Sequence, residues 1–209
     1  MRALIPTALL LALALSAAAC SGPTPDEVHV RRIEAERAVK DEFFRNGPDS
    51  PMPAAVRDQY LPLAYYDIDL AYAAPAQLKM SETRVPVTMP TSTGRLREME
   101  RIGTLEFTLQ GRPLQLAAFV DAGTPQVTRL FVPFADETSG TETYAAGRYM
   151  DLDPERSGIY IVDFNVAYHP YCYFNAEYDC PFPPPENRLP VPVRAGEKLG
   201  AAAPALDVP

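Results

Sequence analysis

The spacing of apolar residues changes along the chain, from a helical period in residues 25–46 to a strand period after residue 63. Four apolar residues share one face of the predicted helix: Val28, Ala35, Val39 and Phe43. Ile33 and Phe44 lie off this stripe, which predicts a helix that is contacted from two sides.

The ends of this helix are marked by capping residues. Thr24 is placed as the N-cap, Pro25 as the first helical residue and Glu27 as the partner that closes a capping box. Gly47 and Pro48 end the helix. A second, short helix is predicted over residues 53–60.

Short segments with strand periodicity follow. They cover residues 66–72, 84–89, 101–109, 114–120, 128–134, 146–152 and 158–164. Residues 110–113 carry the glycine of a hairpin turn. The fold class predicted is mainly β (α+β): an antiparallel curled sheet, barrel-like or sandwich-like, with the N-terminal helices packed beside it. A doubly wound parallel sheet is excluded because strands and helices do not alternate.

The first twenty residues have the three regions of a secretory signal: Arg2, an apolar run over residues 3–15, and small residues ending at Cys20. Small residues before a cysteine resemble a bacterial lipobox, which predicts lipidation of Cys20. The alternative is an ordinary signal peptide that contains a cysteine. A retention signal more often has Asp after the cysteine, so by resemblance to Gram-negative lipoproteins Ser21 favours the outer membrane, facing the periplasm. The expected partner of the anchor is therefore the membrane.

The predicted organisation is a signal peptide (1–19), a lipidated tether (20–25), one globular domain (26–198) and a flexible tail (199–209). The net charge is −8, and removal of the signal takes away Arg2 and no acid. A surface of this sign repels phosphate groups, so no nucleic-acid partner is expected. The remaining partner classes are an envelope protein or a small-molecule ligand.

Two long motifs carry a resemblance to a known family. They are FADETSGTETYAAGRY at residues 134–149 and DFNVAYHPYCYFNAEYDCPFPPPENRL at residues 163–189, followed by AGEK at residues 195–198. The chain resembles the bacterial and archaeal family named domain of unknown function 1684, from the first helix to Lys198. The resemblance implies no activity. His169 departs from the family pattern, which usually shows Asn, and this weakens an essential role for the imidazole.

The two remaining cysteines, Cys172 and Cys180, are predicted to form a disulfide because the predicted compartment oxidises thiols. A zinc site with His169 would lack a fourth ligand. Nucleophilic catalysis by Cys172 is disfavoured because Pro170 breaks the helical spacing to His169. No metal and no cofactor are expected.

The acidic loop ADETSGTETY places Asp136 and Glu142 close together, with Tyr144 and Arg148 after it. Paired carboxylates can perform acid–base chemistry or bind calcium, but the spacing does not match a calcium loop. The simpler interpretation is a turn whose side chains satisfy its own backbone, with Arg148 as a structural partner of one acid.

Pro183, Pro184 and Pro185 predict a stiff extended strap, which ends in Glu186, Asn187 and Arg188. This polar group is either a ligand site or a tie that fastens the strap to the acidic loop, Asp163 or Asn165. The tyrosines between residues 144 and 178 are expected to pack in the core and at its rim.

No complete catalytic set can be assembled from these residues. The sequence therefore favours a non-enzymatic, lipid-anchored envelope protein that acts in binding or structure. The alternative is a hydrolase that uses the acidic loop and the polar group around a tyrosine-lined pocket. The candidate ligand residues are Asp136, Glu142, Tyr144, Arg148, Asp163, Asn165, Glu186, Asn187 and Arg188.

Overall fold

The fold is given by a computed structural model that describes residues 22–155 and 157–201. The predicted signal peptide, Cys20 and residues 202–209 lie outside the described residues. Ordered contacts continue past Lys198, because the backbone N–H of Leu199 donates to the carbonyl of Glu142 at 2.9 Å and its side chain packs on the core. The domain thus extends at least one residue beyond its predicted end.

Helix α1 (Pro25–Asn46) has the predicted ends. The Thr24 hydroxyl accepts a hydrogen bond from the Glu27 N–H at 3.2 Å, and the Glu27 carboxylate accepts from the Thr24 N–H at 2.8 Å. This reciprocal pair satisfies two donors at the exposed helix start. Gly47 lies at the other end, where its N–H donates to the Phe43 carbonyl.

The apolar stripe predicted on α1 is not the face that the fold buries. Ile33 and Phe44 are buried, whereas Val28 is 52% exposed, Val39 70% and Phe43 38%. The expected contact from two sides is therefore wrong, because only the face through Ile33 and Phe44 packs on the domain. The stripe through Val39 and Phe43 lies beside that face and stays exposed in the described part of the chain.

Short helical turns follow α1 at η1 (Ala54–Val56) and α2 (Arg57–Tyr60), where a short helix was predicted. The strand predicted over residues 66–72 is wrong, because its last part forms the turn η2 (Leu70–Tyr72). The Asp69 carboxylate accepts from the Ala71 N–H, and the Asn165 side chain bonds both the N–H and the carbonyl of Asp69. Side chains thus take the bonds that a neighbouring strand would supply.

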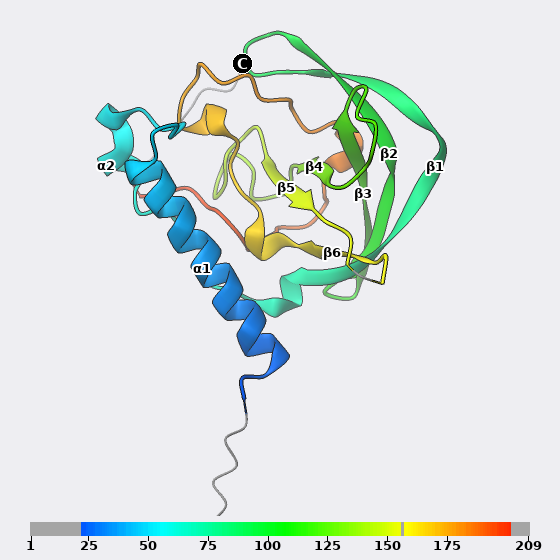
Figure 1. The fold of residues 1–209 in the computed structure, drawn as a ribbon, viewed down its shortest axis with the longest axis horizontal. Coiled ribbons are helices and arrows are strands. Elements are labelled where there is room, and N and C mark those ends of the chain that lie inside the picture. The colour runs from blue at the N-terminus through cyan, green and yellow to red at the C-terminus, as the bar shows by residue number, and fades with distance from the viewer. Residues whose placement is uncertain (1–21, 156, 202–209) are drawn as a thin grey trace, which may run out of the picture.

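Six antiparallel strands form one curled sheet in the order β5-β4-β3-β2-β1-β6 (Figure 1). They are β1 (Ala73–Pro90), β2 (Leu96–Leu109), β3 (Arg112–Asp121), β4 (Leu130–Phe134), β5 (Arg148–Leu152) and β6 (Tyr160–Asp163). The sheet bends until its two end strands touch, so it is nearly a closed barrel with α1 beside it. The predicted fold class is confirmed.

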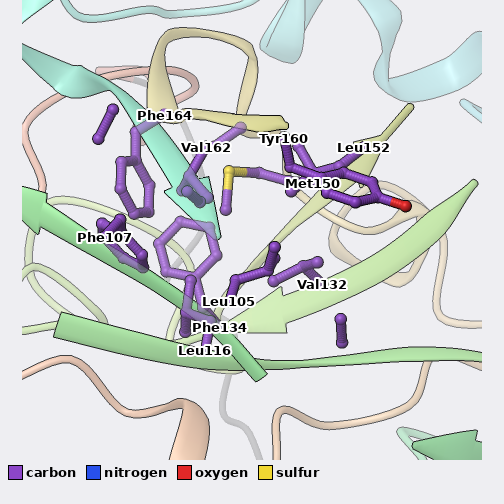
Figure 2. Packing of buried hydrophobic residues seen from close by; sticks show 14 of the residues in the cluster. Leu105, Phe107, Leu116, Val132, Phe134, Met150, Leu152, Tyr160, Val162 and Phe164 are labelled. Carbon is purple, nitrogen blue, oxygen red and sulfur yellow. The ribbon is translucent and has the colours of Figure 1, made fainter. Parts of the chain in front are cut away.

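The interior of the barrel holds the main hydrophobic core. Side chains from all six strands and from η3 (Phe164–Val166) converge there, as Figure 2 shows. The labelled residues are Leu105, Phe107, Leu116, Val132, Phe134, Met150, Leu152, Tyr160, Val162 and Phe164. Phe134 packs edge-on against Phe164 with ring centres 5.2 Å apart.

A bulge in β2 gives the sheet a second apolar face. The pairing of β2 with β3 shifts by one residue between Arg101 and Gly103. Odd-numbered side chains of β2 before the shift therefore point to the opposite face of the sheet from odd-numbered side chains after it. Leu105 therefore belongs to the barrel interior, whereas Met99 joins Phe119 in a separate cluster on the outer face. Met99 and the neighbouring Phe131 line a hollow between this outer face and α1.

Candidate functional site

The acidic loop is a structural fastener centred on Arg148 and Asp136, which are both buried. One Asp136 oxygen accepts from the Thr138 N–H, the Thr138 hydroxyl and the Val193 N–H, and the other accepts from Arg148 at 2.9 Å. With both oxygens bonded and the side chain buried, Asp136 is not accessible to a substrate.

Arg148 also fastens the C-terminal segment. Its guanidinium donates to the carbonyls of Val193, Ala195 and Glu197. These bonds hold residues 193–197 against β5, where Arg148 lies. The pair predicted between Arg148 and an acid of the loop is therefore present, and it is structural.

Asn187 completes the sheet from outside the strands. It lies in η5 (Pro185–Asn187), and its side-chain amide donates to the carbonyls of Ala117 and Pro133 at 2.9 and 2.7 Å. Its carbonyl oxygen accepts from the Ala117 N–H at 2.7 Å. Pro133 has no N–H to give to β3, so Asn187 supplies the missing bonds between β3 and β4.

Asp163 and Asn165 fasten α1 and the segment around Asp69 to the end of β6. One Asp163 oxygen bonds both the N–H and the side-chain amide of Asn165, and the other lies 2.8 Å from His29 Nε2. The Asn165 carbonyl accepts from Arg37 of α1. The proline strap was predicted to bind Asp163 or Asn165, but no described contact joins it to either residue. Both residues bind helix α1 instead.

Glu142, Glu186 and Arg188 do not converge on Asp136. Glu142 binds Arg194 through both of its oxygens and accepts from the Tyr66 hydroxyl at 3.0 Å. Glu186 and Arg188 are exposed and line a separate, open hollow of about 920 Å³. The described geometry gives no support to a hydrolase built on these carboxylates.

A second buried network, which the sequence interpretation missed, joins His169 to Glu197 and Lys40. The backbone N–H of His169 donates to one Glu197 side-chain oxygen at 2.8 Å, and the Lys40 ammonium group donates to the other. His169 Nε2 accepts from the Tyr144 N–H at 3.2 Å, so the ring is neutral with its proton on Nδ1. Burial holds the pKa of His169 well below its usual value, and the charges of Arg148 and Lys40 lower that pKa further.

Cys172 and Cys180 are free and buried, so the structure does not support the predicted disulfide. The Cys172 N–H donates to the Cys180 sulfur at 3.1 Å, and the Cys180 N–H donates to Ser92 at 3.1 Å. The hydrogen bond between the two thiols raises the pKa of Cys172 and lowers the pKa of Cys180. Hydrogen bonding thus takes the place of a covalent bridge. No group of three or more His, Cys, Asp or Glu side chains in the described ranges could hold a metal ion.

The clearest hollow for a ligand is a groove of about 970 Å³ between α1, the outer face of the sheet and residues 168–181. Its volume lies within the range of small-molecule sites. Its floor comes from three strands of the sheet: Met99 of β2, Phe131 of β4 and Tyr149 of β5. One wall is the unpartnered α1 stripe, with Ala35, Val39 and Phe43, and the other is Tyr168, Tyr171 and Tyr178.

Aromatic rings in the groove pack edge to face. Phe131 and Tyr149 have ring centres 4.8 Å apart, Tyr149 and Tyr168 5.9 Å, and Tyr171 and Tyr178 5.3 Å. Burial raises the pKa of both Tyr149 and Tyr168, so their hydroxyls stay protonated. The Tyr149 hydroxyl donates to the Pro181 carbonyl, and the Tyr168 hydroxyl donates to Asp151 at 2.7 Å. These hydrogen bonds fix one tyrosine of the floor and one of the wall in position.

None of the described helices is long and apolar enough to cross a membrane.

Comparison with known proteins places the chain in a family. Residues 58–198 match the model of the family described as protein of unknown function (DUF1684), which is more than half of the chain. The chain belongs to this family. The matched residues begin after α1, so they include the sheet and the strap but not the helix that forms one wall of the groove.

A solved structure agrees with this placement. The solution NMR structure of an uncharacterised protein from Haloarcula marismortui is 38% identical, covers 83% of this chain and 96% of that chain, and has a TM-score of 0.67. A search of curated proteins gave no match. The family resemblance seen in the sequence motifs is thus confirmed over residues 58–198, not from the first helix as expected, and neither comparison assigns an activity.

In this DUF1684 member, Asp136→Asn is expected to lower the free energy of unfolding by about 3–5 kcal/mol, because it leaves the buried Arg148 charge without its partner. Glu142→Gln, which breaks a surface pair, is the matched control and should cost no more than about 1 kcal/mol. Equilibrium unfolding in urea measures both. Equal losses in the two variants would contradict the fastener role of Asp136.

The neutral His169 should make stability depend on pH. Because its folded pKa lies below the unfolded value of about 6.5, the unfolded chain binds the extra proton as pH falls. Stability is complete above about pH 6.5 and falls by up to about 1.4 kcal/mol per pH unit below it. His169→Asn should remove this part of the slope in unfolding curves at pH 5, 6 and 7. An unchanged slope in the variant would exclude His169 as the source.

Proposed function

We propose that this protein is a binding protein that holds a small molecule with a large apolar part in the groove between α1 and the sheet. The observation that supports this most directly is the unpartnered helix stripe. Val39 and Phe43 remain exposed, and they face an aromatic floor and an aromatic wall across a hollow of ligand size. Exposed apolar residues scattered singly need no explanation, but these line one concave surface.

The polar residues support binding over catalysis. The carboxylates first considered for acid–base work are bonded to backbone N–H groups, hydroxyls or arginines, as described for Asp136 and Glu142. Catalytic groups need an accessible atom and a geometry that converges on a substrate. The groove instead offers a mainly apolar and aromatic surface, with most of its charged residues already paired, which suits retention of a ligand.

We also propose that the protein works at the cell envelope, anchored through lipid on Cys20. The support is the order of a charged N-terminus, an apolar run and small residues before the cysteine. Helix α1 begins at Pro25, so a tether of only a few residues would separate the domain from the membrane surface. Outer-membrane placement follows from Ser21 by resemblance to other lipoproteins.

Groove binding can be tested with the uncharged fluorescent probe N-phenyl-1-naphthylamine. We expect saturable binding at one site and a loss of affinity of about 10-fold or more in Val39→Glu, because a carboxylate in the apolar wall must be desolvated. Ile159→Glu is the matched control, since Ile159 is 46% exposed and does not line the groove. Circular dichroism checks that both variants fold. Unchanged probe affinity in folded Val39→Glu would exclude the groove as the site.

Lipidation can be tested by Cys20→Ala in the full-length chain expressed in a Gram-negative host. The wild type is expected in the membrane fraction and the variant in the soluble fraction, because the acyl chains alone hold the domain on the bilayer. Fractionation and immunoblotting measure this, and Cys172→Ala controls for the loss of a cysteine as such. Membrane retention of Cys20→Ala would refute the anchor.

A further inference from the structure

The charges around the groove narrow the class of ligand, an inference that depends on the groove being the binding site. Seven charged residues line it, of which three are cations and four are carboxylates. The cations are Arg32, Lys40 and Arg97, and the carboxylates are Glu36, Asp121, Asp151 and Asp179. What matters for a ligand is which of these charges the protein has already neutralised.

All three cations have partners. Arg32 binds Glu36 at 2.7 Å, and Arg97 binds Asp121 at 2.7 Å. Lys40 binds the buried Glu197, which lies beneath the groove. An anionic ligand would therefore have to displace a carboxylate from each of these cations before it gained a partner.

Two carboxylates stay without a cation. No Lys, Arg or His of the described residues lies within salt-bridge distance of Asp151 or Asp179, and their donors are the hydroxyls of Tyr168 and Thr93. Asp151 is exposed at the end of β5 and is held in position by Tyr168. It makes no ion pair of its own at the rim, beside the tyrosines of the wall, since the nearby Arg129 pairs with Asp153.

Aromatic rings beside a free carboxylate attract organic cations. A cation over a tyrosine ring is stabilised by the ring's electrons, and sites for alkylammonium groups use such rings. The protein already shows this interaction in the groove, where Lys40 Nζ lies 4.7 Å from the centre of the Tyr168 ring and 5.2 Å from that of Phe44. Lys40 also repels a second cation at the inner end, so the positive group of a ligand is favoured at the rim near Asp151.

We propose that the groove binds an organic cation with an apolar tail: the ammonium group lies at the rim against Asp151, Tyr168 and Tyr171, and the tail lies between Val39 and Phe131. The apolar floor fits the tail, and the unneutralised rim carboxylate fits the head. The protein's negative net charge of −8 also attracts a cation at long range.

Three surfactants with the same ten-carbon tail test the head group: decyltrimethylammonium, decyl sulfate and decyl maltoside. Each is titrated below its aggregation concentration against the bound naphthylamine probe, and displacement gives the affinity. The ammonium compound is expected to bind about 10-fold more tightly than the sulfate, with the uncharged maltoside between them. Raising the salt concentration should weaken only the ammonium compound's advantage.

Asp151→Asn tests the residue that carries the selectivity. It should reduce the ammonium compound's affinity about fivefold and leave the maltoside unchanged, since Asn removes the charge but still accepts from Tyr168. Glu82→Gln is the control, because Glu82 is an exposed carboxylate on β1 that does not line the groove. A sulfate that binds as tightly as the ammonium compound, or an Asp151→Asn variant with wild-type selectivity, overturns the proposal.

The outcomes separate the ligand class from the proposed function. Equal displacement by all three compounds rejects the cation preference and leaves the groove as the binding site. Failure of the probe and of every surfactant to bind rejects the groove itself. Sedimentation that shows a dimer of the wild type and a monomer of Val39→Glu assigns the groove to a second copy of this chain and overturns both.

Discussion

The buried guanidinium of Arg148 is the contact on which the architecture depends. It lies in β5 at one end of the sheet, with no exposed surface, and binds Asp136 of the acidic loop together with three carbonyls of residues 193–197. A buried charge is tolerated only when it is paired, and both terminal nitrogens of Arg148 are bonded, so the loop and the C-terminal segment are tied to the same residue. The loop and the C-terminal segment therefore converge on Arg148 in a single arrangement at this end of the barrel. Removal of Asp136 or of Arg148 would leave the other buried charge uncompensated.

Polar ties also determine where α1 lies. His29 bonds Asp163, and Arg37 donates to the carbonyls of Tyr66 and Asn165. Lys40 donates to Glu197, and Asp41 accepts from the Leu63 N–H. These residues lie along the same face of the helix as Ile33 and Phe44. Most helices pack through an apolar stripe, whereas this one is attached largely by hydrogen bonds. The apolar stripe beside this face therefore remains unused by the fold, and the bulge in β2 places Met99 and its neighbours across from it. The groove is a consequence of both features.

Local signals in the sequence predicted local structure well. The capping box fixed the start of α1, and Gly111 marked the hairpin between β2 and β3, where Gln110 and Gly111 have positive φ. The strand predicted over residues 66–72 failed because Asp69 and Asn165, 96 residues apart, satisfy that backbone with side chains. Arg148 was expected to pair with one acid of the loop, and Asp136 is that acid. The groove was not predicted, since a sequence shows that a helix stripe is apolar but not whether the fold covers it. The roles of Glu197 and Lys40 depend on a contact between residues that are 157 positions apart.

The proposed anchor and the proposed groove share one element. Helix α1 rises about 1.5 Å per residue, so its groove residues, from Arg32 to Phe44, begin roughly 10 Å and end roughly 30 Å from its first turn. With lipid on Cys20 and helix from Pro25, the groove would lie within a few nanometres of the bilayer, and the intervening residues are too few to let the domain move far from it. Amphipathic molecules concentrate at that surface, so a short anchor raises the local concentration of the proposed ligand class without any additional contact. The position of the helix would thus serve both the proposed attachment and the proposed binding surface.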